Sequence, residues 1–327
     1  MHDATPAFAS AKDLPALYGM LEQVKMRNGW AKPTPSLYPE PKQTFIPAHW
    51  RFQEARAALH RAGDLVDPAW AERRNLIMAN PIPGNDYATV PTLVGAYQMV
   101  KPGETARSHR HSPNAMRVVV EAEAGSYTIV DGVKVPMAPG DILLTPMGCW
   151  HGHSNESTAE SYWIDFLDAP LVQMLGPMFF EHHPDGLENP DRVDPDSPMR
   201  FGFEDYYPVL TASPEIGEGI RSLELGHDAL LTFDRTVFHV DAGSKLVRPR
   251  STVSRIYAVV RGNGTSTFET SRSVWAPGDM IAVPHWQRHT LEASDDAVLL
   301  EVSDAPLLSK LNWVREERPV PVEDHAQ

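Results

Sequence analysis

Three histidines stand at spacings that could bring their imidazoles to one metal ion. His109 and His111 are separated by a single residue, and His151 follows further along the chain. Residues i and i+2 of a β-strand point to the same face, so the first two imidazoles would project together. His151, on a neighbouring strand, would complete the set. Imidazole nitrogens suit Fe, Zn, Cu and Ni alike, so the ligands alone leave the metal open.

The glycines and prolines around these histidines are also regularly spaced. Gly103 precedes His109 by six residues, and Gly140 precedes His151 with Pro146 between them. These two groups resemble the paired motifs of the cupin family, spacing for spacing. The resemblance implies a small antiparallel β-barrel with a metal at its centre.

One ligand of the usual cupin pattern is missing. The family's glutamate stands three or four residues after the second histidine, where the nearby places here hold Ala115 and Met116. Three neutral imidazoles would leave a divalent ion its full charge and about three open coordination positions. A substrate that chelates through a carboxylate and a hydroxyl fills two of them, and dioxygen can take the third.

An internal repeat determines the organisation of the chain. The sequence Ala-Pro-Gly-Asp at 138–141 recurs at 276–279, an offset of 278 − 140 = 138 residues. The same offset relates three further pairs: Arg117 and Arg255, Pro146 and Pro284, His151 and His289. It also relates His109 and His111 to Val247 and Pro249, so we expect no metal site in the second copy. The repeat predicts a duplicated β-domain.

Hydrophobic periodicity divides the chain into a helical start and a β-rich remainder. Apolar residues at helical spacing predict helices over 14–24 and 51–61. From about residue 89, short runs of β-formers alternate with Gly, Pro, Asp and Asn, which is typical of a barrel or jelly roll. We therefore predict a mainly β bicupin, two tandem antiparallel β-barrel (jelly-roll) domains with an N-terminal helical extension. The predicted boundaries are 1–88 for the extension, 89–175 for the metal-binding cupin, 176–220 for a connector with little regular structure, 221–310 for the metal-free cupin, and 311–327 for a tail.

Composition and charge narrow the class of protein. The 327 residues are 42% hydrophobic and carry a formal net charge of −14, which argues against nucleic acid or an anionic membrane as a partner. The lone Cys149, the lack of a long apolar run and the absence of a secretion signal predict a cytoplasmic protein. An anionic substrate would gain nothing from the overall field, so local cations would have to hold it.

Several blocks resemble gentisate 1,2-dioxygenases and their relatives acting on salicylates and 1-hydroxy-2-naphthoate. These blocks lie at 71–81, 92–104, 108–132, 138–155 and 162–172, and the likeness spans roughly 45–310. The resemblance implies an Fe(II)-dependent ring-cleaving dioxygenase that uses O₂ and a small aromatic carboxylate. It also implies a homo-oligomer, a tetramer by family resemblance.

The resemblance assigns roles to particular residues. The metal ligands would be His109, His111 and His151, the carboxylate partner Arg117, the catalytic or orienting residues His153, Asp165 and Gln98, and the other substrate contacts Arg73 (preferred to Arg74), Val94 and Ala96. The spacing supports two of these roles. Arg117 lies six residues after His111, and His153 two after His151, so each would share the barrel-facing side on a continuous strand.

Val94 stands where the family is expected to place an aromatic residue. A smaller side chain there would enlarge the cavity or remove a stacking partner. Gentisate then becomes less suitable than a 5-substituted salicylate, such as 5-nitrosalicylate, or 1-hydroxy-2-naphthoate. Two other classes stay open: a non-redox metallocupin isomerase or hydrolase, and a binding or storage bicupin. The pair His182-His183 in the connector is predicted to be solvated.

Overall fold

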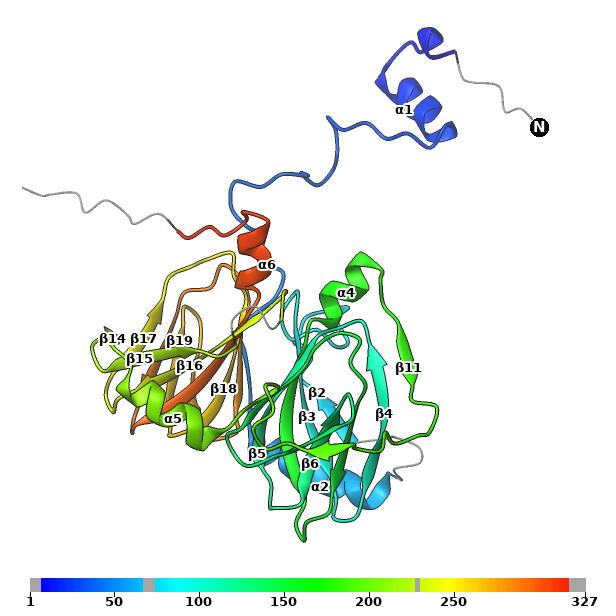
Figure 1. Cartoon of the computed structure of the whole chain (residues 1–327). Helices are drawn as coiled ribbons and strands as arrows, with labels where there is room; N and C mark the ends of the chain where they lie inside the picture. Colours follow the sequence, from blue (N-terminus) through cyan, green and yellow to red (C-terminus); the bar gives the residue numbers. More distant parts are fainter. Residues whose placement is uncertain (1–6, 67–73, 227–229, 318–327) are drawn as a thin grey trace, which may run out of the picture. The chain divides into compact units, whose positions relative to one another are not determined.

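A computed structural model describes residues 7–66, 74–226 and 230–317 of the chain. Contacts divide the chain into a short N-terminal unit, 1–42, and a large unit, 43–327 (Figure 1). The N-terminal unit contains a short 3-10 helix, η1 (Phe8–Ser10), and α1 (Leu14–Gln23), neither of which has a buried residue. Asp13 caps α1 by accepting a hydrogen bond from the Ala16 amide at 2.8 Å. The helix predicted over 14–24 is confirmed.

The large unit consists of four sheets that pair into two barrels (Figure 1). One sheet of barrel 1 has the strand order β13 (Arg200–Phe201), β8 (Ile142–Thr145), β5 (Ala115–Glu121), β10 (Ser161–Leu167), β3 (Val94–Val100), β2 (Arg74–Ile77). Its other sheet has the order β11 (Phe180–His182), β4 (Thr105–His111), β9 (His151–Asn155), β6 (Ser126–Val130), β7 (Val133–Pro136), β12 (Arg192–Val193). One sheet of barrel 2 has the strand order β1 (Ala48–Trp50), β21 (Met280–Val283), β18 (Arg255–Arg261), β23 (Ala297–Ser303), β16 (Asp234–Val240), β15 (Ile220–Glu224), β14 (Glu215–Gly217). Its other sheet has the order β17 (Lys245–Arg248), β22 (His289–Ala293), β19 (Gly264–Phe268), β20 (Arg272–Trp275). Two tandem jelly-roll barrels are as predicted.

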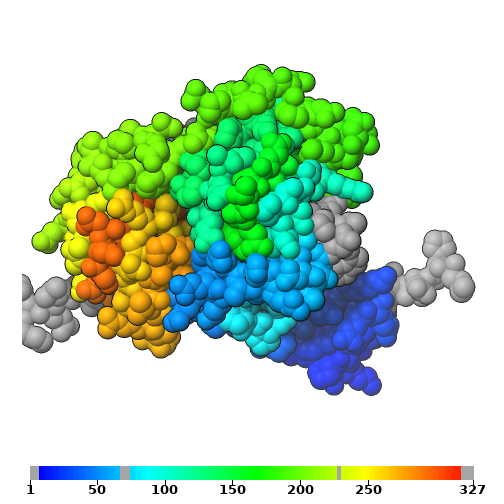
Figure 2. Space-filling model, turned by 90° about the horizontal axis from the view of Figure 1, so that it is seen from below, coloured from blue at the N-terminus to red at the C-terminus, as the bar shows by residue number. Residues whose placement is uncertain are grey.

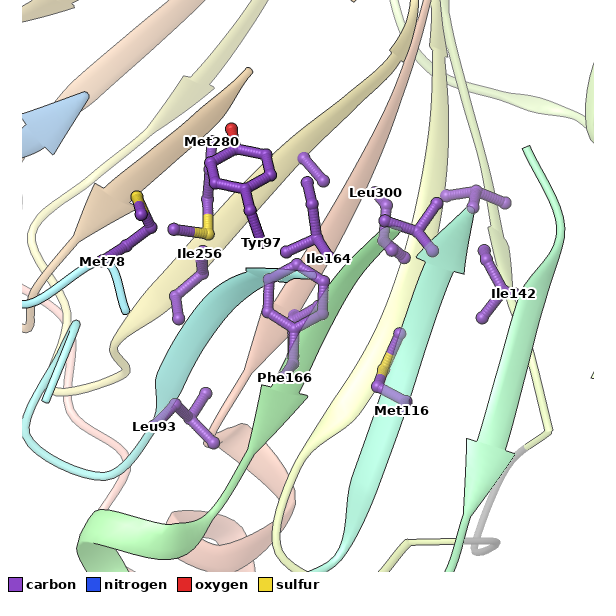
Figure 3. Close-up of a cluster of buried hydrophobic side chains, with 14 of the residues drawn as sticks. Met78, Leu93, Tyr97, Met116, Ile142, Ile164, Phe166, Ile256, Met280 and Leu300 are labelled. Carbon is purple, nitrogen blue, oxygen red and sulfur yellow. The ribbon is translucent and has the colours of Figure 1, made fainter. Parts of the chain in front are cut away.

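The two barrels pack against each other through an apolar cluster (Figure 3). All seven residues of β3 are buried, because alternate side chains face the barrel interior and the other barrel. Tyr97 and Ile164 on the outward face of barrel 1 meet Ile256, Met280 and Leu300 of barrel 2 in this cluster. Each fully buried side chain of this size contributes about 1.5–3 kcal/mol. This shared core makes the two barrels one body.

Each barrel also receives a strand from the segment that precedes the other. β1 precedes barrel 1 but pairs with β21 of barrel 2, and β13 precedes barrel 2 but pairs with β8 of barrel 1. A helix follows each exchanged strand: α2 (Phe52–Leu65) and α5 (Phe203–Ala212). Figure 2 shows the first of these segments, in light blue, lying against both barrels. The repeated unit is therefore strand, helix and barrel, and its strands are exchanged.

The two Ala-Pro-Gly-Asp turns hold the exchanged helices. Asp279 accepts a hydrogen bond from the Phe52 amide at 2.8 Å, and Asp141 accepts one from the Phe203 amide at 2.9 Å. A carboxylate at a helix N-terminus offsets the unpaired amides there. Gly278, with φ of +84°, has no room for a side chain, since a Cβ would lie 2.7 Å from the Phe52 ring. The repeated motif thus joins the two halves.

The predicted boundaries differ from the observed elements in two places. The helical extension predicted over 1–88 contains α1 and α2, but β1 and β2 also lie there and join the sheets. The connector predicted over 176–220 with little regular structure contains α5 and five short strands or strand starts: β11, β12, β13, β14 and the beginning of β15. Two short helices, α4 (Ala169–Leu175) and α6 (Ala305–Lys310), end the barrels. No helix in the described ranges has the length and apolar character that a membrane span requires.

Candidate metal centre and its surroundings

Strands β4 and β9 bring the three predicted metal ligands together inside barrel 1. His109 lies directly opposite His151 in the pairing of these strands, and His111 follows on the same strand as His109. One ring nitrogen from each of the three histidines lies within 4.8 Å of the others, and all three side chains are buried. In the described part of the chain, this is the cluster that could hold a metal ion.

Backbone carbonyls orient all three imidazoles in the same way. The Nδ1 atoms of His109, His111 and His151 lie 3.2, 2.8 and 3.1 Å from carbonyl oxygens two residues away in the chain. A carbonyl only accepts, so each Nδ1 carries a proton, and in the neutral form of each ring Nε2 is the atom with a lone pair. Burial, followed by repulsion from His109 and His111, lowers the pKa of His151 well below its usual value. Three imidazoles that backbone carbonyls hold in orientation fit a divalent metal ion.

A second polar group joins the opposite sheet of the barrel to the metal-bearing sheet. Arg117 is 1% exposed, and its Nη1 donates to Thr128 at 3.1 Å and lies 2.7 Å from His153 Nδ1. Its Nε is 3.2 Å from Asp165 Oδ1, an ion pair that is not aligned as a hydrogen bond. Asp165 also accepts a hydrogen bond from Gln98 at 2.5 Å. The four residues predicted to act beside the metal therefore form one connected network.

Besides the two atoms of the Arg117–Asp165 ion pair, two buried polar atoms of this interior lack a hydrogen-bond partner among the described residues. They are the carbonyl oxygen of Gln98 and the indole nitrogen of Trp163, whose ring lies 5.0 Å from that of His153. Native proteins leave few such atoms unpaired, and those that remain are common at binding sites. The interior thus has polar capacity for a ligand beyond the protein's own pairs.

Comparison with known proteins agrees with this geometry. The cupin domain model matches residues 96–167. A 5-aminosalicylate 1,2-dioxygenase of Comamonas sp is 33% identical over 93% of this chain and 90% of its own length, and a gentisate 1,2-dioxygenase of Streptomyces sp is 34% identical over 97% and 99%. This chain belongs to the gentisate/salicylate 1,2-dioxygenase family. The crystal structure of a salicylate 1,2-dioxygenase from Pseudaminobacter salicylatoxidans superimposes with a TM-score of 0.85, at 28% identity, covering 94% of this chain and 97% of that one.

The chain is accordingly a ring-cleaving dioxygenase with a metal cofactor. Among its other predicted site residues, Val94, Ala96 and Gln98 alternate along β3, and Ala96 lies directly opposite Asp165. Residues opposite each other in a sheet share a face, so all three point into barrel 1 with Asp165. Val94 is 6% exposed.

Of the two neighbouring arginines, Arg73 and Arg74, the structure describes Arg74. Arg74 is buried and held by Glu104, with its Nη2 2.9 Å from Glu104 Oε1, and by the Val66 carbonyl. It is therefore committed to holding the chain after α2. Arg73, which the sequence favoured as the substrate contact, lies outside the described residues.

The strand register corrects the sequence-derived counterparts in barrel 2. Thr145 and Val283 are counterparts at the 138-residue offset of the repeat. Thr145 pairs with Ala115 and Val283 pairs with Arg255, so β5 matches β18 at an offset of 255 − 115 = 140. The counterpart of Arg117 is then Tyr257, and the predicted match with Arg255 is wrong. His289 lies opposite Arg248, as His151 lies opposite His109. Arg248, and not Val247, therefore stands in the place of His109.

Sequence reasoning missed the strand that extends the metal-bearing sheet. β11 pairs with β4, placing Phe180 opposite His111 and His182 opposite His109. His182 and His183 are exposed and half-buried, in keeping with their predicted solvation. The alternation of Phe180 and His182 about the charged Glu181 was the available signal for a strand.

Proposed function

We propose that the enzyme uses Fe(II) and O₂ to open the ring of a hydroxylated aromatic carboxylate. The bond broken is the one between the ring carbons that bear the carboxyl and hydroxyl groups, and both oxygen atoms of O₂ enter the product. The observation that supports this proposal is the group of three buried imidazoles, with no carboxylate among them, whose Nδ1 atoms are oriented by backbone carbonyls. A three-nitrogen set leaves room for a chelating substrate beside O₂.

Iron is proposed because the reaction needs a metal that changes oxidation state. His109, His111 and His151 would hold it through Nε2, since their Nδ1 atoms donate to backbone carbonyls. When bound, Fe(II) supplies positive charge for the carboxylate and hydroxylate and an electron path between substrate and O₂. Nitrogen ligands also suit zinc, so the metal requires direct analysis.

Arg117 is the residue we propose for the substrate carboxylate. Its guanidinium is buried, and a charge-assisted pair with a carboxylate is strong in a buried site. Asp165 and Thr128 would hold the guanidinium in place during this contact. His153, in contact with Arg117, is placed to take the proton of the substrate hydroxyl, and Gln98 orients Asp165.

The substrate class follows from the relatives and from Val94. Related enzymes are named for gentisate, 5-aminosalicylate and 1-hydroxy-2-naphthoate, and one salicylate 1,2-dioxygenase has been crystallised with gentisate. All these molecules carry a hydroxyl next to a carboxylate on an aromatic ring. Because Val94 is small and faces the interior, we propose a salicylate with a substituent, or a fused ring, in preference to gentisate.

We also propose that the enzyme acts as a homo-oligomer. Large apolar side chains are exposed on and after α4, at Met174, Leu175 and Met178. Exposed apolar patches of this kind are typical of surfaces that bind another protein. Sedimentation velocity of the full-length protein tests the proposal, and a single species with the mass of one chain would contradict it.

The decisive experiment is turnover of the Fe(II)-loaded enzyme under ¹⁸O₂. Oxygen uptake is measured with gentisate, salicylate, 5-substituted salicylates and 1-hydroxy-2-naphthoate, and the product is analysed by mass spectrometry. We expect one O₂ consumed per ring opened and two ¹⁸O atoms in the product. Product formation without O₂ uptake would instead support a metallocupin isomerase or hydrolase. Binding of the same compounds without any product would support a storage or binding protein.

A further inference from the structure

We propose that Phe180 forms an aromatic wall of the substrate cavity, beside the three histidines, and selects for the aromatic ring of the substrate. The inference rests on the proposed function, because it assigns a contact to the ring of that substrate. Phe180 begins β11, in the segment between the barrels, and lies outside the motifs that contain the metal ligands. Figure 1 shows β11 alongside β4 at the edge of barrel 1.

The register of β11 fixes the direction in which Phe180 points. Phe180 lies opposite His111, Glu181 opposite Arg110, and His182 opposite His109. Directly opposed residues of a sheet present their side chains on the same face. Glu181 and Arg110 form an ion pair on the outer face, and Phe180 therefore projects on the inner face with the metal-site histidines.

Ring contacts hold Phe180 in a defined position there. Its ring stacks on the His109 imidazole with centroids 5.0 Å apart and planes 26° apart. His182 meets the same ring edge-on, with centroids 4.8 Å apart. Offset stacking and edge-to-face contact are the favoured arrangements of aromatic rings. The two histidines therefore fix the plane of the phenyl ring beside the metal site.

One part of this ring is still available to a ligand. Phe180 is 50% exposed and belongs to none of the buried hydrophobic clusters of the described residues. Trp163, the other aromatic ring near the network, is 1% exposed and packed within a cluster. Among the described phenylalanine, tyrosine and tryptophan rings, Phe180 is the one that contacts the triad and retains an accessible surface. A flat substrate ring chelated at the triad would lie within its reach.

The experiment compares Phe180→Leu with Phe179→Leu in the metal-loaded, full-length enzyme. Phe179 is the matched control, since it is adjacent and 43% exposed but has no ring contact with the triad among the described residues. Calorimetry measures binding of salicylate and of cis-2-hydroxycyclohexanecarboxylate, which keeps the carboxylate and hydroxyl but has no aromatic face. We expect Phe180→Leu to weaken salicylate binding by about 2- to 12-fold, the range of one aromatic contact. The saturated acid should change less than about 2-fold, and Phe180→Tyr should restore salicylate binding.

Other outcomes overturn the inference. Equal loss for both ligands, or a loss of metal with unchanged affinity in the remaining loaded enzyme, would mean that Phe180 only supports His109. If Phe179→Leu weakened salicylate binding as much as Phe180→Leu, that result would also contradict a role of Phe180 in contacting the substrate ring. Because calorimetry needs no turnover, failure of the wild type to consume O₂ would count against the proposed function and leave this test intact.

Discussion

The two barrels share a fold but fill the same interior positions differently. In barrel 1 those positions hold His109, Arg117, His151, His153 and Asp165. The strand register matches them in barrel 2 with Arg248, Tyr257, His289, Leu291 and Glu301. A fixed guanidinium therefore stands where one metal ligand stands, and a phenol replaces the buried arginine. Only one imidazole of the triad is kept.

The retained imidazole has a different partner at Nε2 in the two barrels. In barrel 1 the Nδ1 of His151 donates to a carbonyl, which leaves Nε2 to face the metal position. In barrel 2 the Nε2 of His289 lies 2.9 Å from the Tyr257 hydroxyl, which itself donates to Glu301 at 2.6 Å. The Nδ1 of His289 lies 3.4 Å from the Gln287 carbonyl oxygen, as that of His151 lies 3.1 Å from the Cys149 carbonyl oxygen. The Tyr257 hydroxyl thus occupies the side of the ring that in barrel 1 faces the metal position.

Two arginine side chains pair with the buried carboxylate in barrel 2. Arg248 lies 3.1 Å and Arg255 3.5 Å from the Glu301 carboxylate. Although burial opposes ionisation, these two arginines hold the pKa of Glu301 below its usual value. The comparison teaches that a half-buried arginine can stand where the other barrel has a metal-site histidine, because the buried carboxylate beside it requires positive charge in an interior of low dielectric.

The largest expected difference between the barrels is in metal binding. His151→Ala should remove both the metal and all measurable turnover, since two imidazoles retain a divalent ion poorly. His289→Ala, the matched change in barrel 2, should leave one metal ion per chain and normal oxygen uptake. Metal analysis by mass spectrometry and an oxygen electrode measure both properties. Stoichiometric iron in His151→Ala would refute the assignment of the triad.

The next largest effect is expected at Arg117. Arg117→Lys removes the planar two-point contact with a carboxylate. It should weaken transition-state binding by about 2–4 kcal/mol, and so lower kcat/KM, while the metal stays bound. Tyr257→Phe, at the corresponding position of barrel 2, should leave kcat/KM unchanged. Steady-state kinetics with the best substrate of the panel decides between them. Wild-type efficiency in Arg117→Lys would show that another group holds the carboxylate.

His289 should make stability depend on pH. Burial, with repulsion from Arg255, lowers its pKa from 6.5 to about 4. Between pH 6.5 and about 4, His289 is therefore protonated in the unfolded chain but neutral in the folded chain. This contribution to stability is complete above pH 6.5 and is lost as pH falls towards 4, by about 3 kcal/mol in total. Urea unfolding at pH 7.5 and pH 5 should show a smaller difference for His289→Gln than for wild type, and equal pH dependence would contradict the shift.

The smallest expected effect concerns Val94, whose counterpart in barrel 2 by register is Asp234. Val94→Trp adds an aromatic ring to the interior face and should shift preference from bulky salicylates towards gentisate. One such contact discriminates by about 1–3 kcal/mol, or roughly 10- to 200-fold in the ratio of kcat/KM values. Kinetics with gentisate and 1-hydroxy-2-naphthoate measure the ratio. An unchanged ratio, together with a strong wild-type preference for gentisate, would place Val94 outside the pocket.

The sequence by itself determined the features that depend on local periodicity. His109 and His111, two residues apart on a strand, had to share a face whatever the rest of the chain did. The repeated Ala-Pro-Gly-Asp turns marked two copies of one β-domain, and the blocks around the triad indicated the family. Loss of the triad in the second copy also followed from residue types alone, because neither Val247 nor Pro249 is a metal ligand.

The tertiary structure decided what depends on pairing between distant strands. A register shift between Ala106 and His109 places His109 opposite His151, and so changes which residue of barrel 2 is its counterpart. The exchange of β1 and β13, and the addition of β11 to the metal-bearing sheet, likewise leave no local signal. Hydrogen bonds between strands far apart in sequence fix each of these choices. A shift of one residue reverses every side chain, so only the folded chain could show that Phe180 faces the histidines and that Arg248 replaces one of them.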